Sequence, residues 1–185
     1  MEFVMKEKLY PVELKKVIYP PTNGTALILS TEIKTFVMFV GLYEGAAIIR
    51  ELNGDRPPRP LTHELIVNIL AGFDIHLKQV IIYDIIDSAF IANLILEQVI
   101  EDEEDGTVKR QEVRIDARPS DCIILALKFN KEIYVTQKVL DQVTDIKTEF
   151  LEKSKDPIHF DWKDIDFDFE DEEGKDEFWQ GEDND

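Results

Sequence analysis

The pattern of apolar and polar positions predicts two groups of β-strands. The first group is β-rich with partial alternation, and short polar or turn segments separate its members, residues 12–19, 26–29 and 35–40. The second group consists of long β-branched runs at residues 79–86, 90–100 and 108–115. Both groups favour antiparallel neighbours, and a short run at residues 133–136 predicts one further strand.

Helical periodicity connects the two groups. Residues 42–52 have an apolar centre that is closer to helix than to strand. A second helix is predicted to begin at Thr62 as its N-cap, with Leu61 and Ile66 placed as a hydrophobic staple. Its apolar side chains form one stripe, which we expect to be its buried face: Leu65, Ile66, Ile69, Leu70 and Phe73.

A third predicted helix begins at Pro119 and is apolar on nearly every side over residues 122–129, so we expect it at the centre of the core. Residues 138–151 predict a weaker terminal helix. Together the elements indicate an α+β fold, in which a largely antiparallel or mixed β-sheet packs with a few helices.

Composition divides the chain into a domain and a tail. The 185 residues, 44% of them hydrophobic, suffice for one core, which we place in residues 1–150. Residues 151–185 form an acidic tail with aromatic residues, of a composition typical of flexible segments, and carry a net charge of −11 from 15 acids and 4 bases. The domain keeps −7 of the total −18 and lacks the basic surface typical of nucleic-acid binders.

Cysteine usage and hydropathy predict a cytoplasmic protein without a membrane partner. The single cysteine, Cys122, cannot form an intramolecular disulfide, and residues 1–10 lack the apolar core of a secretory signal. The most apolar stretches are far shorter than the roughly 20 residues that cross a bilayer. Cys122 stands in an apolar helix with no histidine beside it, which indicates a buried, inert thiol.

Two segments, residues 59–65 and 116–121, are difficult to explain by packing alone. Each combines proline, a hydroxyl residue and charged side chains at the start of a predicted helix. Helix amino termini present unpaired N–H groups and a partial positive charge, so two of them close together can hold a phosphate or another anion. Arg59 and Arg118 would strengthen such a site.

These segments carry a family resemblance. The sequence contains Val40-Gly41 and Glu44-Gly45-Ala46, then Arg59-Pro60-Leu61-Thr62-His63-Glu64-Leu65, then Asp116-Ala117-Arg118-Pro119-Ser120-Asp121 with the apolar helix behind it. Over most of residues 8–145 it resembles the bifunctional nuclease family, a bacterial and plant domain credited with cleaving DNA and RNA. The family often has Asp in place of Glu64 and Ala in place of Cys122, exchanges that keep charge and small size. The resemblance implies a nuclease that acts on DNA and RNA and assembles as a homo-oligomer, a dimer or larger.

The chemistry of phosphodiester hydrolysis assigns roles to the matching positions. The reaction needs a neutralised phosphate, an activated water and a protonated leaving group, which Mg²⁺ or Mn²⁺ bound by carboxylates can largely provide. The expected catalytic residues are His63, Glu64, Asp116 and Asp121. The expected substrate-binding residues are Arg59, Thr62, Arg118 and Ser120. The expected metal ligands are Glu44, Asp116 and Asp121.

Other readings of the same residues stay open. Thr62, Ser120 and Asp121 can be helix caps, and Asp116 with Arg118 can be an ion pair that holds a turn. The two helix starts also suit a non-catalytic module that binds a small anionic ligand. A third alternative is an oligomeric interaction module whose strand edges pair with copies of itself and whose acidic tail recruits a basic protein partner.

Overall fold

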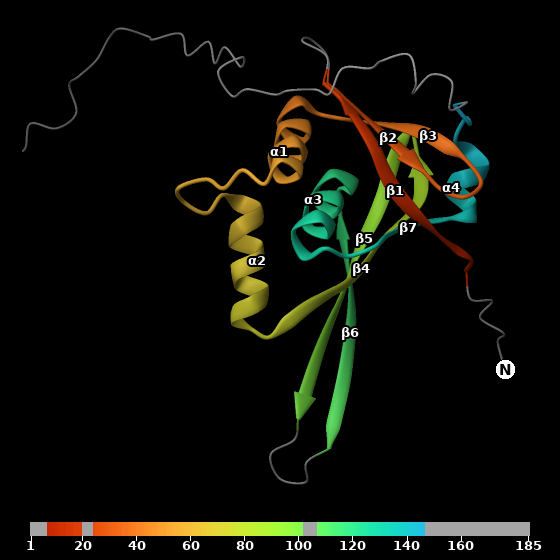
Figure 1. Cartoon of the computed structure of the whole chain (residues 1–185). Helices are drawn as coiled ribbons and strands as arrows, with labels where there is room; N and C mark the ends of the chain where they lie inside the picture. The colour runs from red at the N-terminus through yellow and green to blue at the C-terminus, as the bar shows by residue number, and fades with distance from the viewer. Residues whose placement is uncertain (1–6, 20–23, 102–106, 147–185) are drawn as a thin grey trace, which may run out of the picture.

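The computed structural model describes residues 7–19, 24–101 and 107–146, and its strands form one mixed sheet (Figure 1). The sheet order is β3-β2-β1-β7-β4-β5-β6. The strands are β1 (Leu9–Ile18), β2 (Thr25–Ser30), β3 (Thr35–Val40), β4 (Ile75–Ile86), β5 (Ala89–Glu101), β6 (Val108–Ala117) and β7 (Ile133–Thr136). With four helices beside this sheet in the described residues, the predicted α+β class is confirmed.

Two antiparallel units make up most of the sheet, as the sequence predicts. β1, β2 and β3 pair in succession, and so do β4, β5 and β6. β7 lies between the two units, antiparallel to β1 and parallel to β4. The last strand of the described chain therefore joins the first unit to the second.

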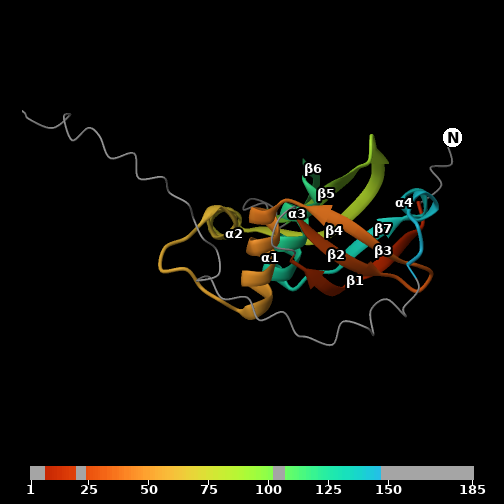
Figure 2. The same ribbon diagram turned by 90° about the horizontal axis from the view of Figure 1, so that it is seen from above.

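Three helices lie on one side of the sheet and the fourth lies apart from them (Figures 1 and 2). They are α1 (Leu42–Asn53), α2 (Thr62–Gly72), α3 (Pro119–Phe129) and α4 (Gln137–Gln142). α3 contacts α1, α2 and strands β4 and β5, whereas α4 packs on β4 and β7. The predicted central helix is confirmed by this position of α3.

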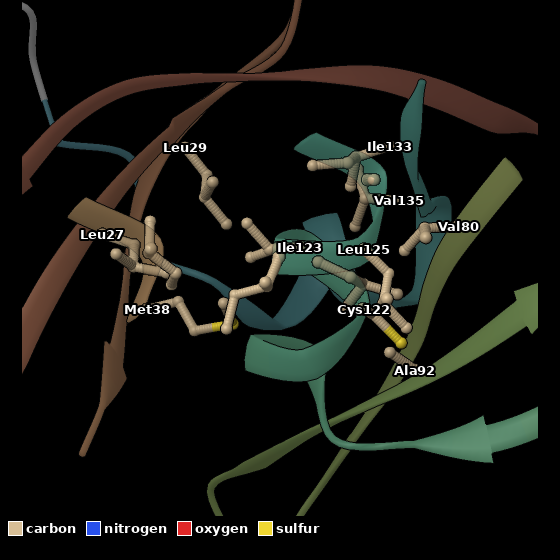
Figure 3. Close-up of a cluster of buried hydrophobic side chains, with 14 of the residues drawn as sticks. Leu27, Leu29, Met38, Val80, Ala92, Cys122, Ile123, Leu125, Ile133 and Val135 are labelled. Atoms are coloured by element: carbon tan, nitrogen blue, oxygen red, sulfur yellow. The ribbon is translucent and has the colours of Figure 1, made fainter. Parts of the chain in front are cut away.

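The core is built around α3 (Figure 3). Its residues from Cys122 to Ala126 are all buried. Figure 3 shows Ile123 near Leu27 and Met38 of the first unit, and Cys122 beside Ala92 of the second. Burying one large aliphatic side chain contributes about 1.5–3 kcal/mol, so α3 stabilises both units together.

The start and the buried face of α2 differ from the prediction. Leu61 is the N-cap and Thr62 is the first helical residue, because the Glu64 carboxylate accepts a hydrogen bond of 3.0 Å from the Leu61 backbone N–H. A hydrophobic staple uses the residue before the N-cap, but Leu61 is the N-cap itself, so the predicted staple between Leu61 and Ile66 has the wrong positions. Of the predicted stripe only Leu70 is buried, and three other members face solvent: Leu65, Ile69 and Phe73 are 53%, 48% and 67% exposed.

The predicted terminal helix is shorter than residues 138–151. α4 ends at Gln142, and Val143 is already extended. The chain then turns to β3, where the backbone N–H of Thr35 donates to Asp145 Oδ1 at 3.0 Å and the Ile146 N–H donates to the Thr35 carbonyl at 2.7 Å. These contacts replace helical ones. Residues 147–151 and the predicted acidic tail lie outside the described residues.

Candidate functional site

The amino-terminal turns of α2 and α3 meet at a hydrogen bond between side chains. His63, in the first turn of α2, places Nε2 at 2.9 Å from Oδ1 of Asp121, in the first turn of α3. The two side chains are 15% and 25% exposed. The structure thus brings together the two helix starts that the sequence singles out.

Arg118 extends this pair toward a third helix. As the N-cap residue of α3, it donates from Nε to Asp121 Oδ2 at 2.9 Å and from Nη1 to Glu44 Oε1 at 2.6 Å. Glu44 lies in the first turn of α1. The Arg118 side chain remains 65% exposed, although Nη2 also lies 3.4 Å from Asp121 Oδ1, so the guanidinium links two carboxylates at the protein surface.

The electrostatics of the pair fix the proton on His63. Partial burial raises the pKa of Asp121, but hydrogen bonds from Arg118 and His63 outweigh burial and lower this pKa below its usual value. The ionised carboxylate can only accept, so Nε2 of His63 must carry the proton. In the neutral ring Nδ1 then remains as an acceptor. The hydrogen bond to Asp121 likewise raises the pKa of Arg118.

Two glycines allow Glu44 to reach Arg118. Gly41 is the N-cap of α1, and a Cβ there would lie 2.3 Å from Glu44 Oε2. A Cβ on Gly45 would lie 1.9 Å from Oγ1 of the buried Thr25 in β2. The absence of a side chain at Gly45 lets the start of α1 pack close against β2, and its absence at Gly41 leaves room for the Glu44 carboxylate.

Arg118 lines two cavities. A cavity of about 460 Å³ has a polar rim and an apolar interior between α2, α3 and the β5–β6 pair, and it is lined by Thr62, His63, Ile66, Leu70, Leu94, Leu96, Ile115, Ala117, Arg118, Asp121 and Leu125. A smaller one of about 350 Å³ includes Glu44, Ser120 and residues of β3 and β5. The His63–Asp121 pair lines the larger cavity.

A family model supports the predicted resemblance. The model of the bifunctional nuclease domain matches residues 27–147, which include both helix starts and the Glu44 segment. The chain belongs to this family. It is also similar to uncharacterized proteins from two strains of Mycobacterium tuberculosis, each 35% identical over 124 residues that cover 66% of this chain and 68% of the relative.

The structure of this bifunctional nuclease domain places Glu64 in a different cluster. Glu64 Oε1 lies 2.5 Å from Nζ of Lys128, which also binds Glu51 at 2.6 Å. Burial raises the pKa of Glu64, but the hydrogen bond from Lys128 and further contacts outweigh it and lower this pKa. The sequence analysis did not predict Lys128 as part of a site. Its position as a lone cation in the last turn of an apolar helix could have indicated one. Glu64 is therefore separate from the His63–Asp121 pair.

The remaining predicted site residues lie on other elements or border one of the two cavities. Asp116 is exposed on β6, and because side chains alternate along a strand it points to the face opposite Ala117, which lines the larger cavity. Thr62 borders that cavity with His63. Ser120 is buried beside the smaller cavity, and Arg59 lies exposed on the connector before α2.

Two of the three predicted metal ligands lie around Arg118, and the third points away from it. The carboxylates of Glu44 and Asp121 both bind Arg118, and Asp116 points to the other face of β6. In the described residues no group of three or more His, Cys, Asp or Glu side chains is arranged to hold a metal ion. The same part of the chain contains no helix with the length and apolar character that crossing a membrane requires.

Proposed function

We propose that this bifunctional nuclease domain hydrolyses phosphodiester bonds in DNA and RNA at the site formed by His63, Asp121 and Arg118. The observation that carries the proposal is the 2.9 Å hydrogen bond between His63 and Asp121, which lines a cavity at the meeting point of two helix starts. Family membership supports the nuclease class. The geometry supplies a base and a cation for that chemistry.

In the proposed reaction His63 acts as general base. Asp121 holds the ring through Nε2, which leaves Nδ1 to take a proton from a water molecule. The water oxygen attacks phosphorus, the bond from phosphorus to the leaving oxygen breaks, and that oxygen takes a proton from solvent. The exposed guanidinium of Arg118 binds the phosphate oxygens and offsets the charge that develops on them.

A divalent cation at this site would compete with Arg118 for the carboxylates. Because the Arg118 guanidinium already binds the carboxylates of Glu44 and Asp121, Mg²⁺ or Mn²⁺ would have to displace it in order to bind them. Parallel reactions in Mg²⁺, Mn²⁺ and EDTA measure whether cleavage needs one.

The decisive experiment compares two histidines. Cleavage of labelled single- and double-stranded DNA and RNA is measured for the wild type, His63→Gln and the matched control His76→Gln. His76 is exposed on β4 and pairs only weakly with Asp74, at 3.4 Å. Loss of a general base lowers rates by about 100-fold or more, so His63→Gln should lose cleavage while circular dichroism and substrate binding stay unchanged. His76→Gln should cleave normally.

Arg118→Gln separates substrate binding from the chemical step. We expect it to weaken binding of a labelled oligonucleotide, measured by fluorescence anisotropy, as well as cleavage. Equal cleavage by wild type and His63→Gln would reject the site. An inactive wild type would reject the nuclease proposal.

The net charge of −7 on residues 1–150 favours one alternative, a binding site for a small phosphorylated or carboxylated ligand. Such a site would be less sensitive to salt than polymer binding, whose affinity falls steeply as ionic strength rises. Titrating inorganic phosphate and an oligonucleotide at two salt concentrations distinguishes the two functions.

A further inference from the structure

The last described residue lies against the free edge of β3. β3 is an outer strand of the sheet, and among the described strands it pairs only with β2. The backbone N–H of Ile146 donates to the Thr35 carbonyl at 2.7 Å, at the first residue of β3. The Thr35 N–H faces the same side, because it donates to Asp145 Oδ1 at 3.0 Å. Ile146 therefore stands where an added strand would begin to pair with this edge.

The contacts before Ile146 indicate the direction of such a strand. Lys34, just before β3, donates from Nζ to the carbonyls of Leu140 and Val143 at 2.5 and 3.2 Å. The next contacts along the chain come from residues 145 and 146 and reach the next residue of the edge. An antiparallel ladder would instead place the residues before Ile146 beside β3, whereas residues 137–142 form α4. A continuation along this edge therefore runs parallel to β3.

The hydrogen bond between Ile146 and Thr35 also sets the register. Because the direction of backbone groups alternates along a strand, the N–H and C=O of Val37 and Phe39 face the same side as those of Thr35. In a parallel ladder each such residue binds two residues of its neighbour. Residue 147 would then lie beside Val37 and residue 149 beside Phe39. Thr148 between them would donate to the Val37 carbonyl and accept from the Phe39 N–H.

The sequence after Asp145 fits the two faces of β3. Its even-numbered residues face the core, where Phe36 and Met38 are 0% and 1% exposed. Aligned residues of neighbouring strands point to the same face, so the even-numbered residues of the added strand would face the core as well. These residues are Ile146, Thr148 and Phe150. The charged residues Lys147 and Glu149 would stand on the outer face, beside the exposed Phe39.

The smaller cavity lies at the far end of this edge. It is lined by residues 38–41, by residues 88–90 at the start of β5 and by residues 118–120 at the start of α3. Phe150 would align with Val40, so its ring can enter this cavity of about 350 Å³. Phe90 in the lining already stacks on Phe36, with ring centres 6.1 Å apart, which favours another aromatic side chain there.

We propose that residues 147–151 bind the free edge of β3 as a parallel strand, with Phe150 in the smaller cavity, and that the acidic residues behind them cover Arg118. Arg118 lines the same cavity and is 65% exposed. Residues 151–185 carry a net charge of −11. Docking holds their carboxylates near the guanidinium at a high effective concentration, so they compete with phosphate for it. This competition rests on the proposed function, whereas the docking does not.

Cysteine crosslinking in the full-length chain tests the docking. Phe39→Cys with Glu149→Cys should form a disulfide within one chain on mild oxidation, because aligned residues of neighbouring strands lie about 5 Å apart. Glu32→Cys with Glu149→Cys is the control, since Glu32 precedes β3 and lies about 13 Å or more along the strand from Phe39. Adding Phe150→Asp should abolish the preference for Phe39. The native Cys122 is fully buried and should not interfere.

Chemical modification tests the cover over Arg118. Phenylglyoxal modifies exposed arginines, and mass spectrometry of peptides gives the rate for each one. Arg118 should react about two- to fivefold faster in Phe150→Asp than in the wild type, the change expected from losing one exposed ion pair. Arg59, exposed on the connector before α2, is the internal control. Phe178→Asp makes the same change in charge far from the proposed strand and should react like the wild type.

Oligonucleotide binding tests the competition. A labelled single-stranded oligonucleotide should bind Phe150→Asp about two- to fivefold more tightly than it binds the wild type or Phe178→Asp, measured by fluorescence anisotropy at low salt. The difference should shrink as salt rises, because ionic strength screens exposed charges. If no form of the protein binds the oligonucleotide, the proposed function fails, while crosslinking and modification still decide the docking.

Several results would overturn the proposal. Equal crosslinking of residue 149 to positions 32 and 39 would show a tail that does not dock, and disulfides between chains would place the segment on another copy. Equal rates of Arg118 modification in the wild type and Phe150→Asp would refute the cover. Circular dichroism of each variant shows whether the fold is retained.

Discussion

Replacing Gly45 with alanine is expected to destabilise the domain, although alanine is the better helix former. The added Cβ would lie 1.9 Å from Oγ1 and 2.4 Å from Cβ of Thr25, which is fully buried on β2. Overpacking costs about 1–3 kcal/mol, and such short separations favour the upper end of that range. The higher helix propensity of alanine offsets about 1 kcal/mol of this cost, so the free energy of unfolding should fall by about 2 kcal/mol.

Urea unfolding followed by circular dichroism measures this loss, and a thermal scan should show Tm lower by about 4–8 °C for a chain of this size. Gly72→Ala is the matched control. Gly72 also lies in a helix, but a Cβ there meets nothing within 4 Å. That change should leave stability the same or raise it by up to about 1 kcal/mol.

A compensating change tests the contact itself. Thr25→Gly removes all three atoms that the new Cβ would approach, and Thr25 Oγ1 has no hydrogen-bond partner in the described structure to lose. The double variant Thr25→Gly/Gly45→Ala should therefore be more stable than the sum of the single effects predicts. If Gly45→Ala alone is as stable as Gly72→Ala, the close packing of α1 on β2 is refuted.

Three further predictions concern single residues. Burial raises the pKa of Cys122 to about 12, so at pH 8 a thiol reagent should label the protein only after unfolding in urea, and rapid labelling of the folded protein would contradict its burial. Asn130 ends α3 at φ 49°, in the left-handed region; Asn130→Ala should lose about 1 kcal/mol in urea unfolding and Asn130→Gly should not. The fold lowers the pKa of Glu64 from 4.5, so its contribution to the free energy of unfolding is present above that value and is lost as pH falls through the folded-state pKa. Lys128→Met should make stability depend less on pH in this range, as unfolding measurements between about pH 3 and 6 can show.

Local patterns in the sequence predicted most elements because strands and buried helices leave a strong periodic signal. The apolar run after Pro119 identified the central helix. The exposed face of α2 was not predictable in the same way, because whether Leu65 is covered depends on what packs against it across the fold. A pattern of apolar positions alone does not contain that information.

The candidate site was predicted at the level of segments but not of every side chain. The sequence marked both helix starts, and the structure joins them through His63 and Asp121. His63 and Glu64 are adjacent, so they point about 100° apart on a helix and can reach different partners. His63 faces Asp121, whereas the Glu64 carboxylate binds Lys128, which lies 64 positions further along the chain.

The position of β7 has a consequence for the order of folding during synthesis. β7 pairs with residues 9–12 of β1 and with residues 80–82 of β4, yet it ends only at Thr136. The two antiparallel units can form from local hairpins as the chain emerges, but β1 and β4 then keep open edges until β7 arrives. A nascent chain that stops before Ile133 would hold two unjoined antiparallel units, so closure of the sheet must wait until residues 133–136 have been synthesised.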